Sequence, residues 1–144
     1  MDAHRSTALR EAIESFYFAY RAFTESPDRI LEERGLGRVH HRILYFVGRN
    51  PGITVNALLQ VLKVSKQALN LPLRQLLELE LIAVNTARED RRFKELKLTK
   101  EGNALESQLS GTQLEHLASA FANAGPEAET GWREVMQVLA NASE

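Results

Sequence analysis

The sequence predicts a mainly α-helical protein with one small β-hairpin, and three observations support this fold class. Apolar residues recur at three- and four-residue steps over most of the chain, a pattern typical of amphipathic helices. One short stretch, Glu95 to Thr99, instead alternates polar and apolar residues, as a half-buried strand does. Glycine and proline residues at turn-like positions separate these segments from one another.

Length and composition limit the classes of protein that fit. The chain has 144 residues, 44% of them apolar, which suits a single globular unit covering residues 1–144. It has no cysteine, so disulfides, cysteine-type zinc sites and thiol-based sensing are excluded. No apolar run approaches the ~18 residues needed to cross a bilayer, and we expect no secretory leader because residues 1–9 contain no apolar stretch. We therefore expect a soluble, cytoplasmic protein with no membrane partner.

The first third of the chain predicts helices separated by a proline and by glycine turns. Thr7 to Glu25 carries an apolar stripe at helical spacing, and Ser26-Pro27 is expected to end this helix. A short amphipathic piece, Asp28 to Arg34, would stop at Gly35, which suits a left-handed C-terminal cap. The next helix is predicted from Arg38 to Arg49, before an Asn-Pro-Gly turn.

Two short helices follow, and each begins with a good N-cap residue. Thr54 would cap a helix over residues 55–62, and Ser65 a helix from Lys66 to about Leu79. Pro72 lies inside the second of these helices, where it deletes a backbone hydrogen bond and costs ~3 kcal/mol if unrelieved. We therefore predict a kink or a local 3₁₀ distortion between Ala68 and Pro72.

The second half of the chain predicts a hairpin and two further helices. Leu81 to Thr86 is rich in β-forming residues, and the charged segment Ala87 to Lys94 separates it from the alternating strand. Thr99 would then cap a long helix to about Asn123. Gly125-Pro126 ends that helix, and a last helix is predicted over residues 127–142.

Two short helices followed by a hairpin form a winged helix-turn-helix, which we predict for residues 38–100. This segment carries 12 Lys and Arg against 5 Asp and Glu, a net charge of +7. The flanking segments carry −2 and −6, which is why the whole chain sums to only −1. Clustered positive charge indicates a polyanionic partner, here double-stranded DNA, although a solvated basic face is the plainer alternative.

The run Asp90 to Gly102, which reads DRRFKELKLTKEG, resembles the wing signature of the MarR (multiple antibiotic resistance regulator) family. That signature is an Asp-x-Arg at the wing, then a Leu-Thr-x-x-Gly that opens the next helix. Gly35-Leu36 and the run Asn50 to Thr54 also match the family layout, and the resemblance covers about Ala8 to Asn141. It implies a homodimeric transcription factor, usually a repressor, often released from its operator by a small ligand.

The resemblance assigns DNA contacts at the wing, and positions off the apolar stripe of the preceding helix supply others. Arg92 would insert into the minor groove at the wing tip, where Asp90 would hold the shape by pairing with an arginine. On the helix that follows Ser65, Lys66 suits a phosphate, Gln67 and Asn70 could pair with adenine, and Arg74 could reach guanine or phosphate. The predicted contact residues are Ser65, Lys66, Gln67, Asn70, Arg74, Arg88, Asp90, Arg91, Arg92 and Lys94. For any one of them, simple solvent exposure is the alternative.

Two further residues depart from the family pattern. Leu71 stands where the family often has a polar residue or arginine, so it would either touch a thymine methyl or be a poor contact. Glu80 occupies the usual glycine position before the hairpin, so we expect the helix end to be closed in a different way.

The terminal helices, residues 5–34 and 101–142, are predicted to form a helical dimerisation region. They are rich in apolar and aromatic residues, and a twofold dimer would bury these in one shared seam. An ordinary monomer core is the alternative. Acidic ends would keep this region away from phosphates.

A small-molecule effector site is a further expectation. Family ligands often bind between the dimerisation helices and the winged domain, and Phe16, Tyr20, His40 and His41 could line such a cleft. Packing or surface roles are the plainer interpretation. Adjacent histidines on a helix point about 100° apart, so the pair cannot chelate one ion, and we predict no metal site and no cofactor.

The sequence contains no phosphate-binding glycine loop and no nucleophile motif, so we predict no enzyme activity and no catalytic residues. The alternative to DNA binding is a winged-helix protein–protein interaction module without specific DNA binding.

Overall fold

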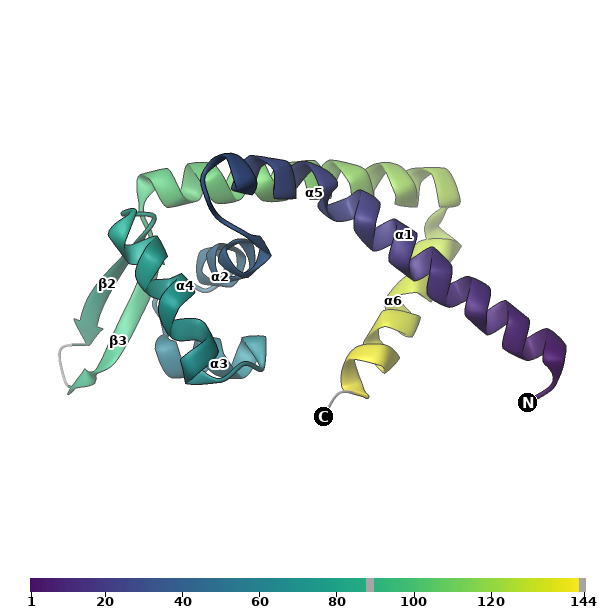
Figure 1. The fold of residues 1–144 in the computed structure, drawn as a ribbon, viewed down its shortest axis with the longest axis horizontal. Coiled ribbons are helices and arrows are strands. Elements are labelled where there is room, and N and C mark those ends of the chain that lie inside the picture. Colours follow the sequence, from purple (N-terminus) through teal and green to yellow (C-terminus); the bar gives the residue numbers. More distant parts are fainter. Residues whose placement is uncertain (88–89, 143–144) are drawn as a thin grey trace.

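The computed structural model describes residues 1–87 and 90–142, and the contact predicted for Arg88 lies outside this range. Six helices and three strands are present in it: α1 (Ala3–Glu33), α2 (Arg38–Arg49), β1 (Ile53–Thr54), α3 (Val55–Leu62), α4 (Lys66–Glu78), β2 (Ile82–Ala87), β3 (Asp90–Leu98), α5 (Lys100–Ala124) and α6 (Pro126–Asn141). Figure 1 shows α2–α4 and the hairpin gathered at one end of an elongated molecule, with α1, α5 and α6 extending away from it. The predicted mainly α fold with a small hairpin is confirmed.

The first helix is longer than predicted, because Ser26-Pro27 does not end it. α1 continues through Pro27 to Glu33, and the proline ring is completely buried. Burying the ring against the core offsets part of the cost of the missing hydrogen bond. Figure 1 shows α1 bending before its last turns run beside α5, as expected for a helix with an internal proline. The helix then stops at Gly35, which adopts the predicted left-handed conformation (φ 71°) and lets the Leu36 amide donate to the Leu31 carbonyl.

The predicted N-caps are confirmed at three positions. The Thr54 hydroxyl accepts from the Ala57 amide at 3.1 Å, and the Ser65 hydroxyl accepts from the Ala68 amide at 3.1 Å. The Thr99 hydroxyl accepts from the Gly102 amide at 3.0 Å. These local hydrogen bonds set where α3, α4 and α5 begin.

Two expectations for α4, the helix that contains Pro72, need correction. All residues of α4, which is described in full, are α-helical, so the predicted 3₁₀ distortion around Pro72 is wrong. A kink at this proline, the other form that we predicted, stays a prediction. We also expected Glu80 to force a different closure of the helix end, and this is wrong, because the usual left-handed cap forms there without a glycine. Glu80 takes the left-handed conformation itself (φ 58°), and the Leu81 amide donates to the Leu76 carbonyl at 3.0 Å. A non-glycine residue pays about 1 kcal/mol for that conformation.

The sheet has one strand more than predicted. β3 lies between β2 and β1 in an antiparallel sheet, and β1 pairs Ile53 with Leu96. The hairpin strands are also longer than expected, because most of the charged segment 87–94 belongs to them. Backbone pairing with β2 continues along β3 to Asp90, with an irregularity between Thr86 and Ala87. We call β2 and β3 together the wing.

The hydrophobic core lies beneath α2, β1, α3, α4 and the wing, which together we call the winged part. Its buried residues come from the end of α1, from α2, α3 and α4, from the wing and from the first half of α5: Leu31, Ile43, Leu44, Val47, Leu58, Leu69, Leu73, Leu76, Leu81, Ile82, Leu96, Leu105 and Leu109. Gly102 lets α5 approach this core, because a Cβ there would overlap the Leu81 carbonyl. The Leu-Thr-x-x-Gly run therefore has a packing role as well as a capping one.

Candidate nucleic-acid interface

One face of α4 is exposed while the other is anchored in the core. Leu69, Leu73 and Leu76 are buried, and they hold the helix against α2 and the wing. Five residues at helical spacing on the outer side are exposed, and we call them the reading face: Lys66, Gln67, Asn70, Leu71 and Arg74. The amphipathic period thus places four of the predicted contact residues together.

Arg74 of the reading face forms only a weak, solvent-exposed ion pair. Arg74 lies 3.9 Å from Glu78 one turn later, and both side chains are about two-thirds exposed. An exposed pair at this distance contributes little to stability, so the guanidinium can exchange it for a phosphate or a base at small cost. Ser65, by contrast, uses its hydroxyl to cap α4. Leu71, with half its surface exposed, lies beside the polar residues of this face.

The wing carries further cations. Lys94 is exposed on β3, where it lies opposite Thr86 of β2. Lys97 is also exposed on β3, and the sequence interpretation did not single it out because it lies beyond the charged tip. The backbones of Asp90, Arg91 and Arg92 belong to β3, but their side chains lie outside what the structure describes, as does Arg88 altogether. Their predicted contacts therefore stay predictions.

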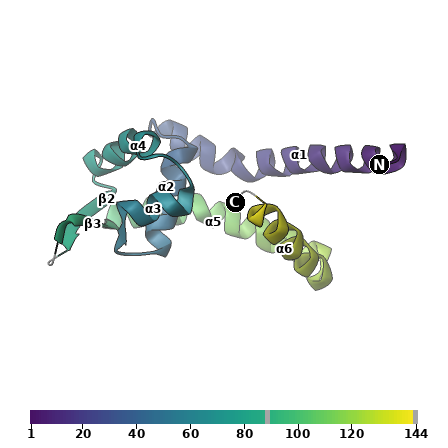
Figure 2. The same cartoon turned by 90° about the horizontal axis from the view of Figure 1, so that it is seen from below.

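The wing and α4 are joined through Thr99. Its hydroxyl donates to the Glu80 carbonyl at 2.6 Å, and its amide donates to the Leu81 carbonyl at 3.1 Å. The end of α4, the end of the wing and the start of α5 therefore meet at one residue. Figure 2 shows α3, α4 and the wing at the opposite end of the molecule from the N-terminus of α1.

A cavity of about 290 Å³ lies where α1, α2 and α5 meet. Tyr20 and His41, two of the predicted effector residues, line it. Phe16 lines a neighbouring depression that it shares with Tyr20. His40, however, does not line the cavity as expected; it is 8% exposed and turns toward α4. Adjacent positions on a helix face different ways, which separates the two histidines.

His41 sits in the cavity wall largely out of water. Its Nε2 lies 3.4 Å from the Ser110 hydroxyl of α5. Burial lowers the pKa of His41, against smaller opposing effects of the Glu106 and Asp28 carboxylates. The neutral imidazole is therefore the favoured form in the folded protein.

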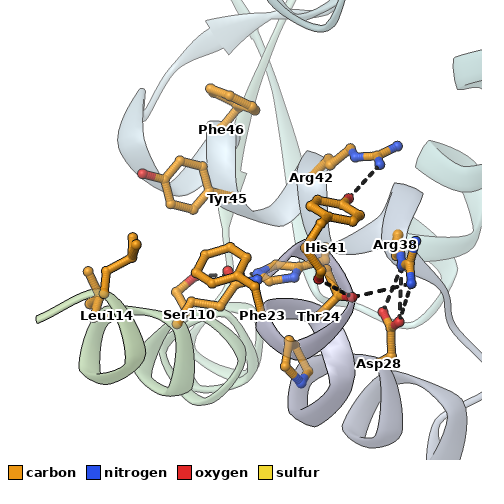
Figure 3. Close-up of a pocket in the computed structure, with 14 residues that line it drawn as sticks. Phe23, Thr24, Asp28, Arg38, His41, Arg42, Tyr45, Phe46, Ser110 and Leu114 are labelled. Carbon is orange, nitrogen blue, oxygen red and sulfur yellow. Dashed lines mark hydrogen bonds and ion pairs between the residues drawn. The ribbon is translucent and has the colours of Figure 1, made fainter. Parts of the chain in front are cut away.

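Sequence reasoning missed an arginine cluster beside this cavity. Arg38 donates to the Asp28 carboxylate through Nε and Nη2, with the shortest distance 2.8 Å, and it donates to the Thr24 hydroxyl at 3.3 Å. Figure 3 shows these contacts and the Arg42 guanidinium, which donates to the Tyr20 hydroxyl at 3.4 Å. The hydrogen bonds to Asp28 raise the pKa of Arg38. No local signal reveals the pair, because Asp28 and Arg38 lie on opposite sides of the Gly35 turn.

The described residues also bear on metal binding and on membrane insertion. Among them, no group of three or more His, Asp or Glu side chains is placed to hold a metal ion. None of the described helices is both long and apolar enough to span a membrane.

Two helices, α3 and α4, followed by a hairpin that pairs with a short preceding strand define a winged helix-turn-helix protein. The sequence model described as "MarR family" matches residues 34–92. A curated relative, the HTH-type transcriptional regulator PetP of Rhodobacter capsulatus, is 44% identical over 131 residues, which is 91% of this chain and 79% of PetP. The chain therefore belongs to the MarR family.

Solved structures share the fold over nearly the whole chain. A MarR family transcription regulator superposes with a TM-score of 0.79 at 22% identity, covering 96% of this chain and 91% of its own. Reduced AbfR, solved bound to DNA, superposes with a TM-score of 0.72 at 19% identity and full coverage of both chains. At these identities the likeness concerns the fold.

Proposed function

We propose that this protein is a sequence-specific, double-stranded DNA-binding transcriptional regulator that acts as a homodimeric repressor and responds to a small molecule. The observation that carries the proposal is the reading face: exposed polar and cationic residues share one side of a helix anchored by buried leucines. This helix lies in the segment that carries the net charge of +7. The relatives support it, since PetP is a transcriptional regulator and AbfR was solved on DNA.

The proposed binding mode places α4 in the major groove and the wing beside it. Gln67 and Asn70 would read adenine through paired hydrogen bonds, and Arg74 would reach guanine or phosphate. Lys66, in the first turn of α4, would contact a phosphate together with the N-terminal end of the helix. Arg92 would enter the adjacent minor groove from the wing, with Asp90 holding the tip and Lys94 near the backbone.

The proposed dimer uses the terminal helices. α6 has no buried residue, and it exposes apolar side chains at helical spacing, including Trp132, Val135 and Leu139. α1 does the same with Ile13, Phe16 and Tyr17. A second copy that packs against both helices would remove this surface from water and place two reading faces ~34 Å apart, one helical turn of DNA.

The proposed effector site is the cavity between α1, α2 and α5. Its wall combines aromatic rings of Tyr20, Phe23 and Tyr45 with polar groups of His41 and Arg42. A concave, mostly apolar site with a few polar groups suits a small organic molecule. A ligand bound there would change the position of the dimerisation helices relative to the winged part.

A salt titration tests DNA binding. The purified protein is measured by fluorescence anisotropy against duplexes selected from a random pool, at several salt concentrations. We expect tight binding to selected duplexes, with the logarithm of affinity falling linearly with the logarithm of salt concentration, because Lys and Arg side chains displace counterions. If no duplex binds, or if binding is independent of salt, the protein-interaction module becomes the better reading.

A further inference from the structure

The first turn of α2 is hydrogen-bonded to the recognition helix α4 through a buried histidine. His40 Nδ1 accepts from the Gly37 amide at 3.0 Å, which closes the N-terminus of α2. Because Nδ1 is an acceptor, the proton of the neutral ring must lie on Nε2. That nitrogen lies 2.8 Å from Gln75 Oε1, so His40 donates a hydrogen bond to the side chain of α4.

The same turn of α2 is also hydrogen-bonded to α1 through Arg38. Arg38, two residues before His40, holds the Asp28 carboxylate with two nitrogens and also contacts the Thr24 hydroxyl. Its guanidinium lies 5.4 Å from the centre of the Tyr20 ring. Asp28, Thr24 and Tyr20 all line the cavity, as does Arg38 itself. A continuous set of contacts therefore runs from the cavity wall on α1, through one turn of α2, to α4.

The position of Gln75 makes this link relevant to DNA reading. Gln75 follows Arg74 of the reading face and lies four residues after Leu71. Its side chain is half-buried on the inner flank of α4, between the exposed reading face and the buried Leu76. Apolar contacts such as those of the α4 leucines do not depend on a particular angle. The His40–Gln75 hydrogen bond does, so it fixes how α4 is rotated about its own axis.

We propose that the His40–Gln75 hydrogen bond positions the recognition helix, and that Arg38 transmits changes at the cavity and α1 to it. Gln75 and His40 are thus positioning residues for DNA reading, and the first turn of α2 is the connection between the proposed effector site and the proposed DNA site. The inference deepens the proposed function and rests on it. A ligand that displaces Arg38 from Asp28 would shift this turn and, through His40, the reading face.

Two variants of Gln75 test the positioning role. Gln75→Leu keeps the side-chain size but removes the acceptor, whereas Gln75→Glu keeps an acceptor oxygen for His40 Nε2. Affinities for a selected duplex and for a random duplex are compared at one salt concentration, with thermal unfolding as a folding check. We expect Q75L to lower the ratio of specific to non-specific affinity about tenfold. Q75E weakens both affinities through its charge but restores the ratio.

A double-mutant cycle tests the connection to the cavity. Arg38→Gln removes the contacts to Asp28, and we expect it to change specific affinity about fivefold in the wild-type background. In the Q75L background the same substitution should have little further effect, because the link to α4 is already broken. Arg29→Gln is the matched control, since it removes an exposed ion pair with Glu25 of the same helix, α1, that Asp28 occupies. It should leave the affinity unchanged in both backgrounds.

The possible results separate this inference from the proposed function. If Q75L keeps the wild-type ratio, the positioning role is wrong. If the effects of R38Q and Q75L simply add, or if R38Q alone changes nothing, the connection to the cavity is wrong. Both tests require that the wild-type protein binds DNA specifically. If the wild-type protein shows no specific DNA binding, the proposed function itself is overturned.

Discussion

The winged part and the helical arm of this molecule are built in opposite ways. We define the helical arm as residues 3–23 of α1, residues 111–124 of α5 and the whole of α6. The winged part has a closed core of buried leucines, whereas no residue of the helical arm, which is described in full, is buried. The arm nevertheless exposes large apolar side chains along its length. The difference teaches that the winged part buries its own apolar side chains, whereas the arm leaves apolar surface exposed, which the proposed second copy would cover.

The largest expected effect comes from placing a charge in the helical arm. Val135→Asp puts a carboxylate into the proposed seam, where it would lose water without gaining a partner. We expect the dimer dissociation constant to rise about 100-fold or more, measured by analytical ultracentrifugation. Operator affinity should fall by a similar factor, because two linked reading heads become independent.

Glu134→Gln, which changes a charge at the preceding position of α6, is the control for this experiment. It should leave the dimer intact. A V135D protein that sediments like the wild type would mean that the arm is not the dimer seam.

The second effect concerns the core of the winged part. Gly102→Ala would force α5 away from Leu81, and we expect it to lower the free energy of unfolding by about 2–3 kcal/mol. Gly111→Ala is the matched change in the arm portion of α5, where a Cβ meets no atom within 4 Å. It should raise the free energy of unfolding by about 0.5–1 kcal/mol, because alanine favours helix. Denaturant unfolding measures both, and equal effects would show that the two parts are packed alike.

The third effect separates DNA reading from assembly. Arg92→Ala should weaken operator binding about tenfold, or 1–2 kcal/mol, with the greatest loss at A·T-rich flanks, where the minor groove is narrow and negative. Sedimentation should not change, because the residue lies in the wing. Anisotropy titrations on duplexes with A·T-rich and G·C-rich flanks make the comparison; a loss that is the same on both would argue against the minor-groove contact.

The smallest effect is a pH dependence at the junction of the two parts. Because the pKa of His41 is lowered in the fold, the unfolded chain binds a proton that the folded chain does not, between the folded pKa and about 6.5. The stability contribution is therefore present above pH 6.5 and is lost as the pH falls. His41→Gln should unfold with a shallower acid dependence than the wild type, whereas the exposed-histidine control His4→Gln should not. Thermal unfolding from pH 7.5 to 5 makes the measurement.

Local signals in the sequence predict the fold well. Thr54, Ser65, Thr99 and Gly35 each act through hydrogen bonds within a few residues, and all four behave as their local context predicts. Features that depend on tertiary packing cannot be predicted from neighbouring residues in this way. Pro27 stays inside α1 because its ring is buried in a core assembled from distant segments.

The candidate site likewise contains features that local sequence predicts and features that depend on tertiary packing. The helical period alone places Lys66, Gln67, Asn70 and Arg74 on one exposed face. It does not reveal which of two adjacent histidines faces the cavity, because that depends on how α2 packs between α1, α4 and α5. The Arg38–Asp28 and His40–Gln75 contacts join residues that are 10 and 35 positions apart, so only the tertiary structure brings them together.

Thr99 has a consequence for how this protein opens. One residue closes α5 with its hydroxyl, holds the Glu80 carbonyl at the end of α4, and ties the end of β3 to Leu81. Two of these bonds protect amide hydrogens: that of Gly102, which the Thr99 hydroxyl holds, and that of Thr99 itself, which the Leu81 carbonyl holds. A movement of Thr99 would break both bonds, and the bond to Glu80 with them. The end of α4, the base of the wing and the first turn of α5 should therefore open as a single cooperative unit.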